Sequence, residues 1–191
     1  MSTRFQLRPR VLNHIGVGAL ACASLVLCTS SARATEIVPS LGMTRAVDNG
    51  NQTQLSGGLA VRGHILPLLE AEIAAGYRSD SRFDGALHVR QWPITTSLWL
   101  TPIPEIYAGG GVGFYQTTMD YDQSRVPLVH DETRQDFGIH LGGGVQVPLA
   151  PSVGLDVGGR YVMMRDQESP LIPQRFNPDF WTLNAGLAFK F

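Results

Sequence analysis

The residue pattern of this chain predicts an all-β fold, an eight-stranded antiparallel up-and-down transmembrane β-barrel. Three observations lead to this prediction. The N-terminal segment is typical of exported proteins, eight later segments alternate apolar with polar or small residues, and the connections between them alternate between short and long. Beyond Ala34 no stretch of about 20 apolar residues occurs, so the sequence predicts no membrane-spanning helix.

The N-terminal segment has the form of a cleaved signal peptide. Three arginines and no acidic residue precede an apolar run from Ile15 to Cys28, which is too short to cross a bilayer as a helix. Small and polar residues follow, and Ala32-Arg33-Ala34 fits the small-x-small pattern that a signal peptidase recognises. We therefore predict cleavage between Ala34 and Thr35, with residues 1–34 as signal peptide and residues 35–191 as the barrel.

Composition excludes several classes of function. Both cysteines, Cys22 and Cys28, fall within the predicted leader, so the mature chain has no thiol for a disulfide or a cysteine-based zinc site. Neither is well placed for lipidation, because the bulky Leu27 precedes Cys28 and Cys22 lies in the middle of the apolar run. Removal of the four leader arginines leaves 11 basic and 16 acidic residues, a net charge of −5. We therefore expect no nucleic-acid partner.

The strands are predicted from alternation with a period of two residues. The last segment shows it most clearly, since Trp181, Leu183, Leu187 and Phe189 alternate with polar or small residues up to Phe191. The first segment is the least regular, because it contains a proline. The predicted strands are Ile37 to Ala46, Leu55 to Arg62, Ala71 to Arg78, Pro93 to Leu100, Ile106 to Tyr121, Phe137 to Val147, Val153 to Tyr161, and Trp181 to Phe191.

The connections support a membrane barrel. Three are short and contain proline, at 65–68, 101–104 and 148–152. The other four are polar, at 48–51, 79–85, 122–133 and 165–179. Short turns at one rim and longer loops at the other are typical of bacterial outer-membrane barrels.

Alternation alone does not decide which face points inward. A membrane barrel is favoured because the polar set contains many small residues and a balance of acids and bases that fits a narrow lumen. Within this register three arginines and three acids should form a lumenal charge network, although a one-residue slip would change the partners. These residues are Arg62, Glu70, Glu72, Arg78, Asp156 and Arg160.

Aromatic residues near the predicted strand ends indicate the two girdles that membrane barrels place at the lipid interfaces. This set is Tyr77, Trp92, Tyr107, Tyr161, Trp181 and Phe191.

Several segments resemble a known family. The C-terminal stretch from Trp181 to Phe191 is similar to the terminal strand of outer-membrane barrels, and the glycine-rich segments 106–115, 142–148 and 153–161 are similar to the family that includes the barrel of outer membrane protein A. The resemblance implies an outer-membrane location, contact with outer-membrane lipid, and an assembly signal at Trp181, Phe189 and Phe191 that the barrel assembly machinery reads. The chain stops at Phe191 without a peptidoglycan-binding domain, so a tethering role is not implied.

Three functions remain open at the level of the sequence. The favoured one is a non-enzymatic structural or surface-interaction barrel, whose loops 122–133 and 165–179 could meet an extracellular partner. The second is a narrow pore or a carrier of small hydrophobic molecules. The third is a lipid A modifying enzyme, which is disfavoured because no serine lies two residues after His64, His88 or His140 on the same strand face, although a triad could assemble across strands. We expect no cofactor and no metal site.

Overall fold

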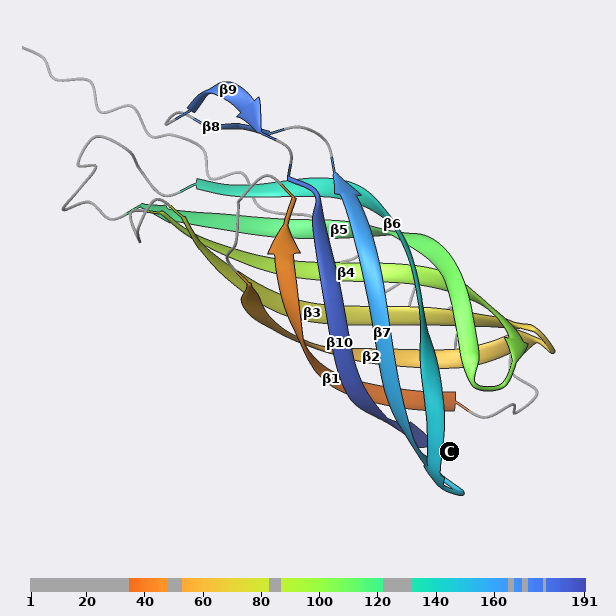
Figure 1. Ribbon diagram of the computed structural model, residues 1–191. Helices are drawn as coiled ribbons and strands as arrows, with labels where there is room; N and C mark the ends of the chain where they lie inside the picture. The colour runs from red at the N-terminus through yellow and green to blue at the C-terminus, as the bar shows by residue number, and fades with distance from the viewer. Residues whose placement is uncertain are drawn as a thin grey trace, which may run out of the picture. The chain divides into compact units, whose positions relative to one another are not determined.

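The chain forms a closed eight-stranded antiparallel barrel, which confirms the predicted fold class (Figure 1). The computed structural model describes residues 35–47, 53–82, 87–121, 132–164, 167–169, 172–176 and 178–191. The barrel strands are β1 (Thr35–Ala46), β2 (Gln54–Leu66), β3 (Leu69–Arg82), β4 (Leu87–Ile103), β5 (Ile106–Tyr121), β6 (Glu132–Ala150), β7 (Val153–Met164) and β10 (Phe180–Lys190). Neighbours in sequence are neighbours in the sheet, and β1 pairs with β10 to close it.

The chain ends meet at the closing seam. The register between β1 and β10 runs from Glu36 opposite Lys190 to Ala46 opposite Phe180. The backbone N–H of Phe191 also donates to the carbonyl oxygen of Thr35 at 3.0 Å. Because the first and last strands pair along their length, no strand edge of the barrel is left open.

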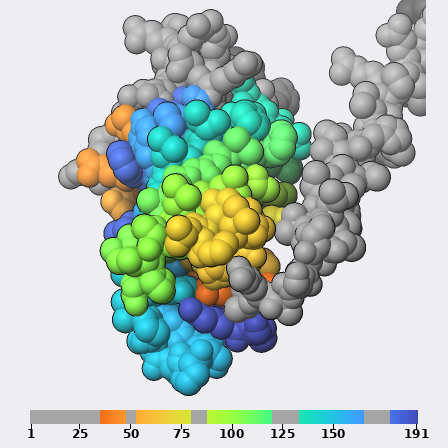
Figure 2. All heavy atoms as spheres, turned by 90° about the vertical axis from the view of Figure 1, so that its right-hand side faces the viewer, coloured from red at the N-terminus to blue at the C-terminus, as the bar shows by residue number. Residues whose placement is uncertain are grey.

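Short turns connect the strands at one rim. Pro67, Pro104 and Pro151 each occupy the first position of a two-residue turn. Proline fixes φ near −65°, which excludes the primed turns that normally match the twist of a hairpin. Each turn is accompanied by a register shift in the adjoining ladder. Figure 2 views this rim, with the turn between β2 and β3 in yellow near its centre.

The strands extend beyond the segments that alternation identifies. β3 continues to Arg82 and β6 begins at Glu132, within regions expected to be loops. The predicted loop 165–179 also contains a small two-stranded sheet of β8 (Gln167–Ser169) and β9 (Ile172–Phe176). Alternation weakens there because a strand that extends past the bilayer no longer needs apolar residues on its outer face.

Two prolines interrupt the hydrogen-bonded ladders without ending their strands. Pro39 pairs with Leu59 on β2, but the register between β1 and β10 skips from Ile37 to Ser40. Pro93 has the same effect on the ladder between β3 and β4, which skips from Ala75 to Arg78. Both gaps follow from the missing N–H of proline, and the barrel remains closed around them.

The outer face is apolar, and most of the expected girdle aromatics lie on it. Across neighbouring strands, the rings of Tyr77 and Trp92 lie 4.6 Å apart and those of Tyr161 and Trp181 lie 4.5 Å apart between centroids. The placement of Tyr107 in the girdle is wrong, because this residue is buried in the lumen. It shares the inward face of β5 with Tyr115, a face whose remaining positions are mostly glycine.

No helix long and apolar enough to span a membrane occurs among the described residues.

Candidate functional site: the lumen of the barrel

The lumen holds a central cluster of ion pairs that joins opposite walls. Arg62 on β2 places Nε 2.7 Å from Oε2 of Glu72 and Nη1 2.6 Å from Oδ2 of Asp156. Arg160 on β7 places Nη2 2.6 Å from Oε1 of Glu72 on β3. These two strands are four places apart in the ring of eight, so the Arg160 to Glu72 contact crosses the barrel. Buried charges are stable only when they are paired in this way.

Aromatic and hydroxyl side chains complete the central cluster. The Tyr107 hydroxyl donates to Oδ1 of Asp156 at 3.0 Å, and its ring lies 4.6 Å from the guanidinium carbon of Arg62. The guanidinium carbon of Arg160 lies 5.1 Å from the ring of Trp99. These contacts restrict both arginines by stacking as well as by charge.

A serine and a histidine meet beside this cluster. Ser97 on β4 and His140 on β6 are joined by a 2.9 Å hydrogen bond between Oγ and Nε2. The same hydroxyl oxygen lies 3.3 Å from Oε1 of Glu72. The one hydroxyl hydrogen of Ser97 can be donated either to Glu72 or to Nε2, and the tautomer of His140 decides which of the two is made.

A second polar layer lies toward the short-turn rim. Glu36 receives a hydrogen bond from Gln146 across the lumen at 2.8 Å and lies 3.3 Å from Nζ of Lys190. On the neighbouring wall, Nε2 of His64 lies 2.9 Å from Oε1 of Glu70. Together with the central cluster, these contacts fill the short-turn half of the lumen with paired polar groups.

A third layer lies toward the opposite rim and depends on hydrogen bonds and ring contacts. Nε of Arg78 donates to Gln91 at 2.7 Å and Nη1 donates to Thr44 at 3.1 Å. Gln91 in turn donates to Thr117 at 2.9 Å. The guanidinium carbon of Arg78 lies 3.6 Å from the centre of the Phe180 ring.

The structure brings four of the six predicted network residues into one cluster. Arg62, Glu72, Asp156 and Arg160 contact one another, whereas Glu70 lies with His64 and Arg78 lies with Gln91 and Thr44. The sequence analysis did not assign Trp99, Tyr107, Ser97 or His140 to this cluster. The alternation of the strands places all four residues on the inward face, and this pattern could have identified them. The two large aromatic residues were not expected to line the lumen.

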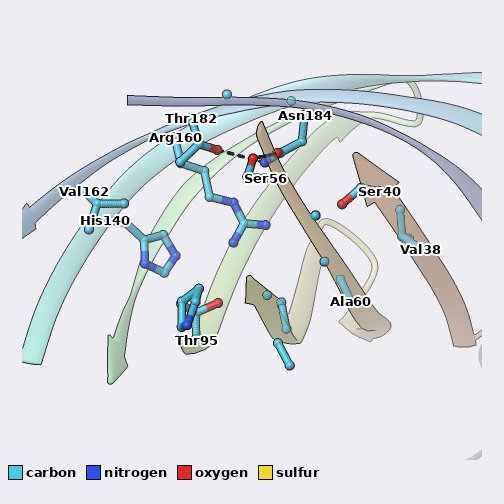
Figure 3. Close-up of a pocket in the computed structure, with 18 of the residues that line it drawn as sticks. Val38, Ser40, Ser56, Ala60, Thr95, His140, Arg160, Val162, Thr182 and Asn184 are labelled. Atoms are coloured by element: carbon cyan, nitrogen blue, oxygen red, sulfur yellow. Dashed lines mark hydrogen bonds between the residues drawn. The ribbon is translucent and has the colours of Figure 1, made fainter. Parts of the chain in front are cut away.

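A cavity of about 120 Å³ lies beside the central cluster (Figure 3). Arg160, His140 and Thr95 line one side, and small residues of β1 and β2, including Ser40 and Ala60, line the other. The cavity exists because β1, β2 and β3 place small side chains opposite the large rings of β4 and β5. Ser56 and Asn184 also line it and are joined by a 3.4 Å hydrogen bond.

The described residues contain no group of three or more His, Cys, Asp or Glu side chains placed to hold a metal ion.

A closed barrel with an apolar exterior and a polar, cross-linked lumen defines an integral β-barrel membrane protein. The chain belongs to the family described as "Outer membrane protein beta-barrel domain", whose profile matches residues 19–191. The protein is therefore a small barrel of the bacterial outer membrane, with the short-turn rim facing the periplasm. The match begins inside the predicted leader, and residues 1–34, including the expected cleavage site, lie outside the described residues.

Solved structures show the same fold at low identity. Neisserial surface protein A is 16% identical with a TM-score of 0.61, covering 83% of this chain and 96% of that one. OprG from Pseudomonas aeruginosa is 16% identical with a TM-score of 0.60, covering 82% and 95%. The attachment invasion locus protein Ail of Yersinia pestis is 12% identical with a TM-score of 0.55, covering 83% and 98%. A comparison with curated protein sequences found no match.

Proposed function

We propose that this protein is a non-enzymatic barrel with a structural or surface-interaction role in the outer membrane. The observation that carries this proposal is the central ion-pair cluster, in which Arg62, Glu72, Asp156 and Arg160 join opposite walls of the lumen. An eight-stranded barrel is just wide enough to be filled by its own side chains. A lumen closed by paired charges leaves the outer rim and the lipid-facing surface as the places where a partner can bind.

The narrow-pore alternative is tested by conductance. We expect purified protein in a planar bilayer to show no discrete conductance steps, whereas Glu72→Ala should admit ions because it removes the acceptor shared by Arg62 and Arg160. Glu105→Ala, at the exposed turn between β4 and β5, is the matched control. Discrete steps in the unmodified protein would refute the closed lumen and favour a pore.

The enzyme alternative lacks the third member of a catalytic triad in the described part of the lumen. Ser97 and His140 share a 2.9 Å hydrogen bond, as a nucleophile and its base would. Nδ1 of His140 has no hydrogen-bond partner among the described residues, whereas a triad needs an acid at that nitrogen. We therefore expect the mass of lipid A to be unchanged when the protein is expressed. A change in that mass that His140→Ala abolishes would establish the enzyme instead.

An extracellular partner would meet the loops at the outer rim. The predicted loops 122–133 and 165–179 fall largely outside the described residues, so their contribution stays a prediction. Cells that express the protein should gain binding to host or bacterial surface molecules, and replacement of residues 122–131 by a short glycine-serine linker should remove it without loss of the folded barrel. Unchanged binding after both loops are replaced would exclude them as the interaction surface.

Export and assembly form a further part of the proposal. We expect signal peptidase to cleave after Ala34, and the barrel assembly machinery to read the terminal strand through Trp181, Phe189 and Phe191. Deletion of Phe191 should therefore reduce the folded, heat-modifiable form in outer membranes severalfold. Phe191→Tyr, which keeps a terminal aromatic ring, serves as the control. Normal folded yield after the deletion would contradict this role.

A further inference from the structure

The outward face of β3, β4, β5 and β6 changes in character toward the outer rim. These are the four longest strands of the barrel, and they reach far toward that rim (Figure 1). At the level of Phe114 and Phe137, whose rings lie 5.6 Å apart between centroids, the outward residues are apolar and exposed. Beyond that level the outward residues are mainly polar. We call this region the rim patch, and its residues are Ser79, Arg90, Trp92, Gln116, Thr118, Thr133 and Gln135.

The row of the rim patch nearer the outer rim carries one guanidinium and several hydroxyl groups. Arg90 on β4 is opposite Ser79 on β3 and Thr118 on β5, and Thr118 is opposite Thr133 on β6. The hydroxyl oxygens of Thr118 and Thr133 are joined by a 3.4 Å hydrogen bond on the surface. Because neighbours across a sheet point to the same face, all four side chains project from the outside of the barrel.

The next row marks the boundary of the hydrocarbon. Trp92 is opposite Gln116, which is opposite Gln135, and the ring of Trp92 also contacts that of Tyr77. Membrane barrels place rings of this kind at the interface between hydrocarbon and headgroups. The row directly below is apolar and consists of Ile94, Phe114 and Phe137. Headgroup, interface and hydrocarbon levels therefore follow one another on one continuous surface.

Arg90 supplies the positive charge of the rim patch. Among the lysine and arginine side chains that the structure describes, only those of Arg45 and Arg90 point outward from the barrel strands. One row closer to the rim, His88 is opposite Asp120, so the positive charge is confined to the level of Arg90. Arg90 also has another contact, but a guanidinium has five N–H donors and can hold a phosphate beside an existing partner.

The rows match an amphiphile whose headgroup contains both phosphate and sugar. A guanidinium binds phosphate through paired charge-assisted hydrogen bonds. The side-chain amides of Gln116 and Gln135 and the threonine hydroxyls can both donate and accept, which suits the hydroxyl and amide groups of an amino sugar. The apolar row suits acyl chains. In the outer leaflet of the outer membrane this combination is found in lipid A, a phosphorylated and acylated glucosamine disaccharide.

We propose that the rim patch is a binding site for lipid A. Arg90 binds a phosphate group, the glutamines and threonines bind the sugar, and Phe114 and Phe137 contact the acyl chains. The proposal deepens the surface-interaction role and rests on the proposed function in that respect, because it names a ligand of the lipid-facing surface. It involves neither the loops nor the lumen.

The test uses the folded barrel in dodecyl maltoside micelles, which contain no phosphate. The added lipids are lipid A, lipid A without its phosphate groups, and phosphatidylglycerol. NMR signals of the Thr118 backbone amide and the Trp92 indole N–H report on the rim patch. We expect lipid A to shift both signals saturably and the dephosphorylated form to bind about 10-fold more weakly, the effect of a hydrogen bond to a charged group. Equal affinities of the two forms, or equally tight binding of phosphatidylglycerol, would overturn the proposal.

Two variants separate the phosphate from the sugar. Arg90→Gln should weaken lipid A binding about 10-fold and remove the difference between lipid A and its dephosphorylated form. Gln116→Leu should weaken both forms about 2- to 10-fold, because it removes a contact with the sugar that does not depend on phosphate. Arg45→Gln is the matched control, since Arg45 also points outward but lies opposite Trp181 on β10, and it should leave the response at Trp92 unchanged.

The substituted side chains all point outward, so the variants should keep the heat-modifiable gel shift of the folded barrel. A difference between the two lipid A forms that persists in folded Arg90→Gln would place the phosphate elsewhere and refute the site. Failure of lipid A to bind would leave the conductance and loop-replacement results of the proposed function as they stand. Failure of those tests would in turn leave a saturable, phosphate-dependent shift at Trp92 intact.

Discussion

The lumen and the lipid-facing surface are built on the same eight strands, but neighbouring side chains constrain the choice of residue more strongly in the lumen than on the outer surface. Glu72 in the lumen is 1% exposed and contacts Arg62, Arg160 and Ser97. Leu183 on the outer face is 55% exposed to what becomes lipid in the membrane. A lumenal residue must match particular partners, whereas an outer residue needs only to be apolar, because fluid lipid adapts to its shape. The difference predicts where substitutions are costly and where they act independently.

The largest effect is expected at the centre of the lumenal cluster. Glu72→Ala leaves Arg160 without its carboxylate and Arg62 with only one, and removal of one partner from a buried ion pair typically costs about 3–5 kcal/mol. Unfolding by urea in lipid vesicles measures this loss. Glu105→Ala, at an exposed turn, should change the free energy of unfolding by less than about 0.5 kcal/mol. Similar values for the two variants would mean that the cluster is not the main constraint in the lumen.

A smaller but substantial effect is expected from a charge on the outer face. Leu187→Arg should destabilise the barrel by about 2–4 kcal/mol if the residue lies near the bilayer midplane, and by less if it lies toward a rim. The same urea titration measures it. Asn184→Leu, on the lumenal face of the same strand, should be better tolerated. A harmless Leu187→Arg together with a damaging Asn184→Leu would show that the assignment of faces is reversed.

Double-mutant cycles measure how strongly neighbouring residues depend on one another in the lumen and on the lipid-facing surface. Arg62 and Glu72 should give a coupling energy of about 0.5–3 kcal/mol, because each single substitution leaves the other charge with fewer partners. Met43 and Leu183, which are opposite one another on β1 and β10 and both exposed, should give a smaller coupling energy of about 0.2–1 kcal/mol, the range of ordinary cross-strand pairs. Additivity at the lumenal pair would indicate a wetter lumen in which water replaces the missing partner.

The two walls of the lumen also differ from each other. β4, β5 and β6 contribute the large side chains Trp99, Tyr107, Tyr115 and His140, whereas β1, β2 and β3 contribute mainly small ones around the cavity. The ion pairs bridge this asymmetry, and the cavity lies beside them, next to the small side chains.

The sequence by itself determined the class of fold, the number of barrel strands and the face that each one buries. A period of two residues is a local property of the strand backbone, so Leu183 and Asn184 are assigned to opposite faces without knowledge of their neighbours. The short turns were also predictable, because Pro67, Pro104 and Pro151 restrict the backbone locally. The same reasoning failed at the far ends of the strands, where β3 and β6 extend past the bilayer and no longer need an apolar face.

Only the tertiary structure decided which lumenal groups meet. Arg160 and Glu72 are separated by 88 positions and come together because β3 and β7 lie opposite one another in the closed ring, a relation that depends on the register of every pair between them. The pairing of Ser97 with His140 and the inward position of Tyr107 have the same origin. The cavity could not be predicted from the sequence of any one strand, because it results from the relative sizes of side chains on opposite walls of the barrel.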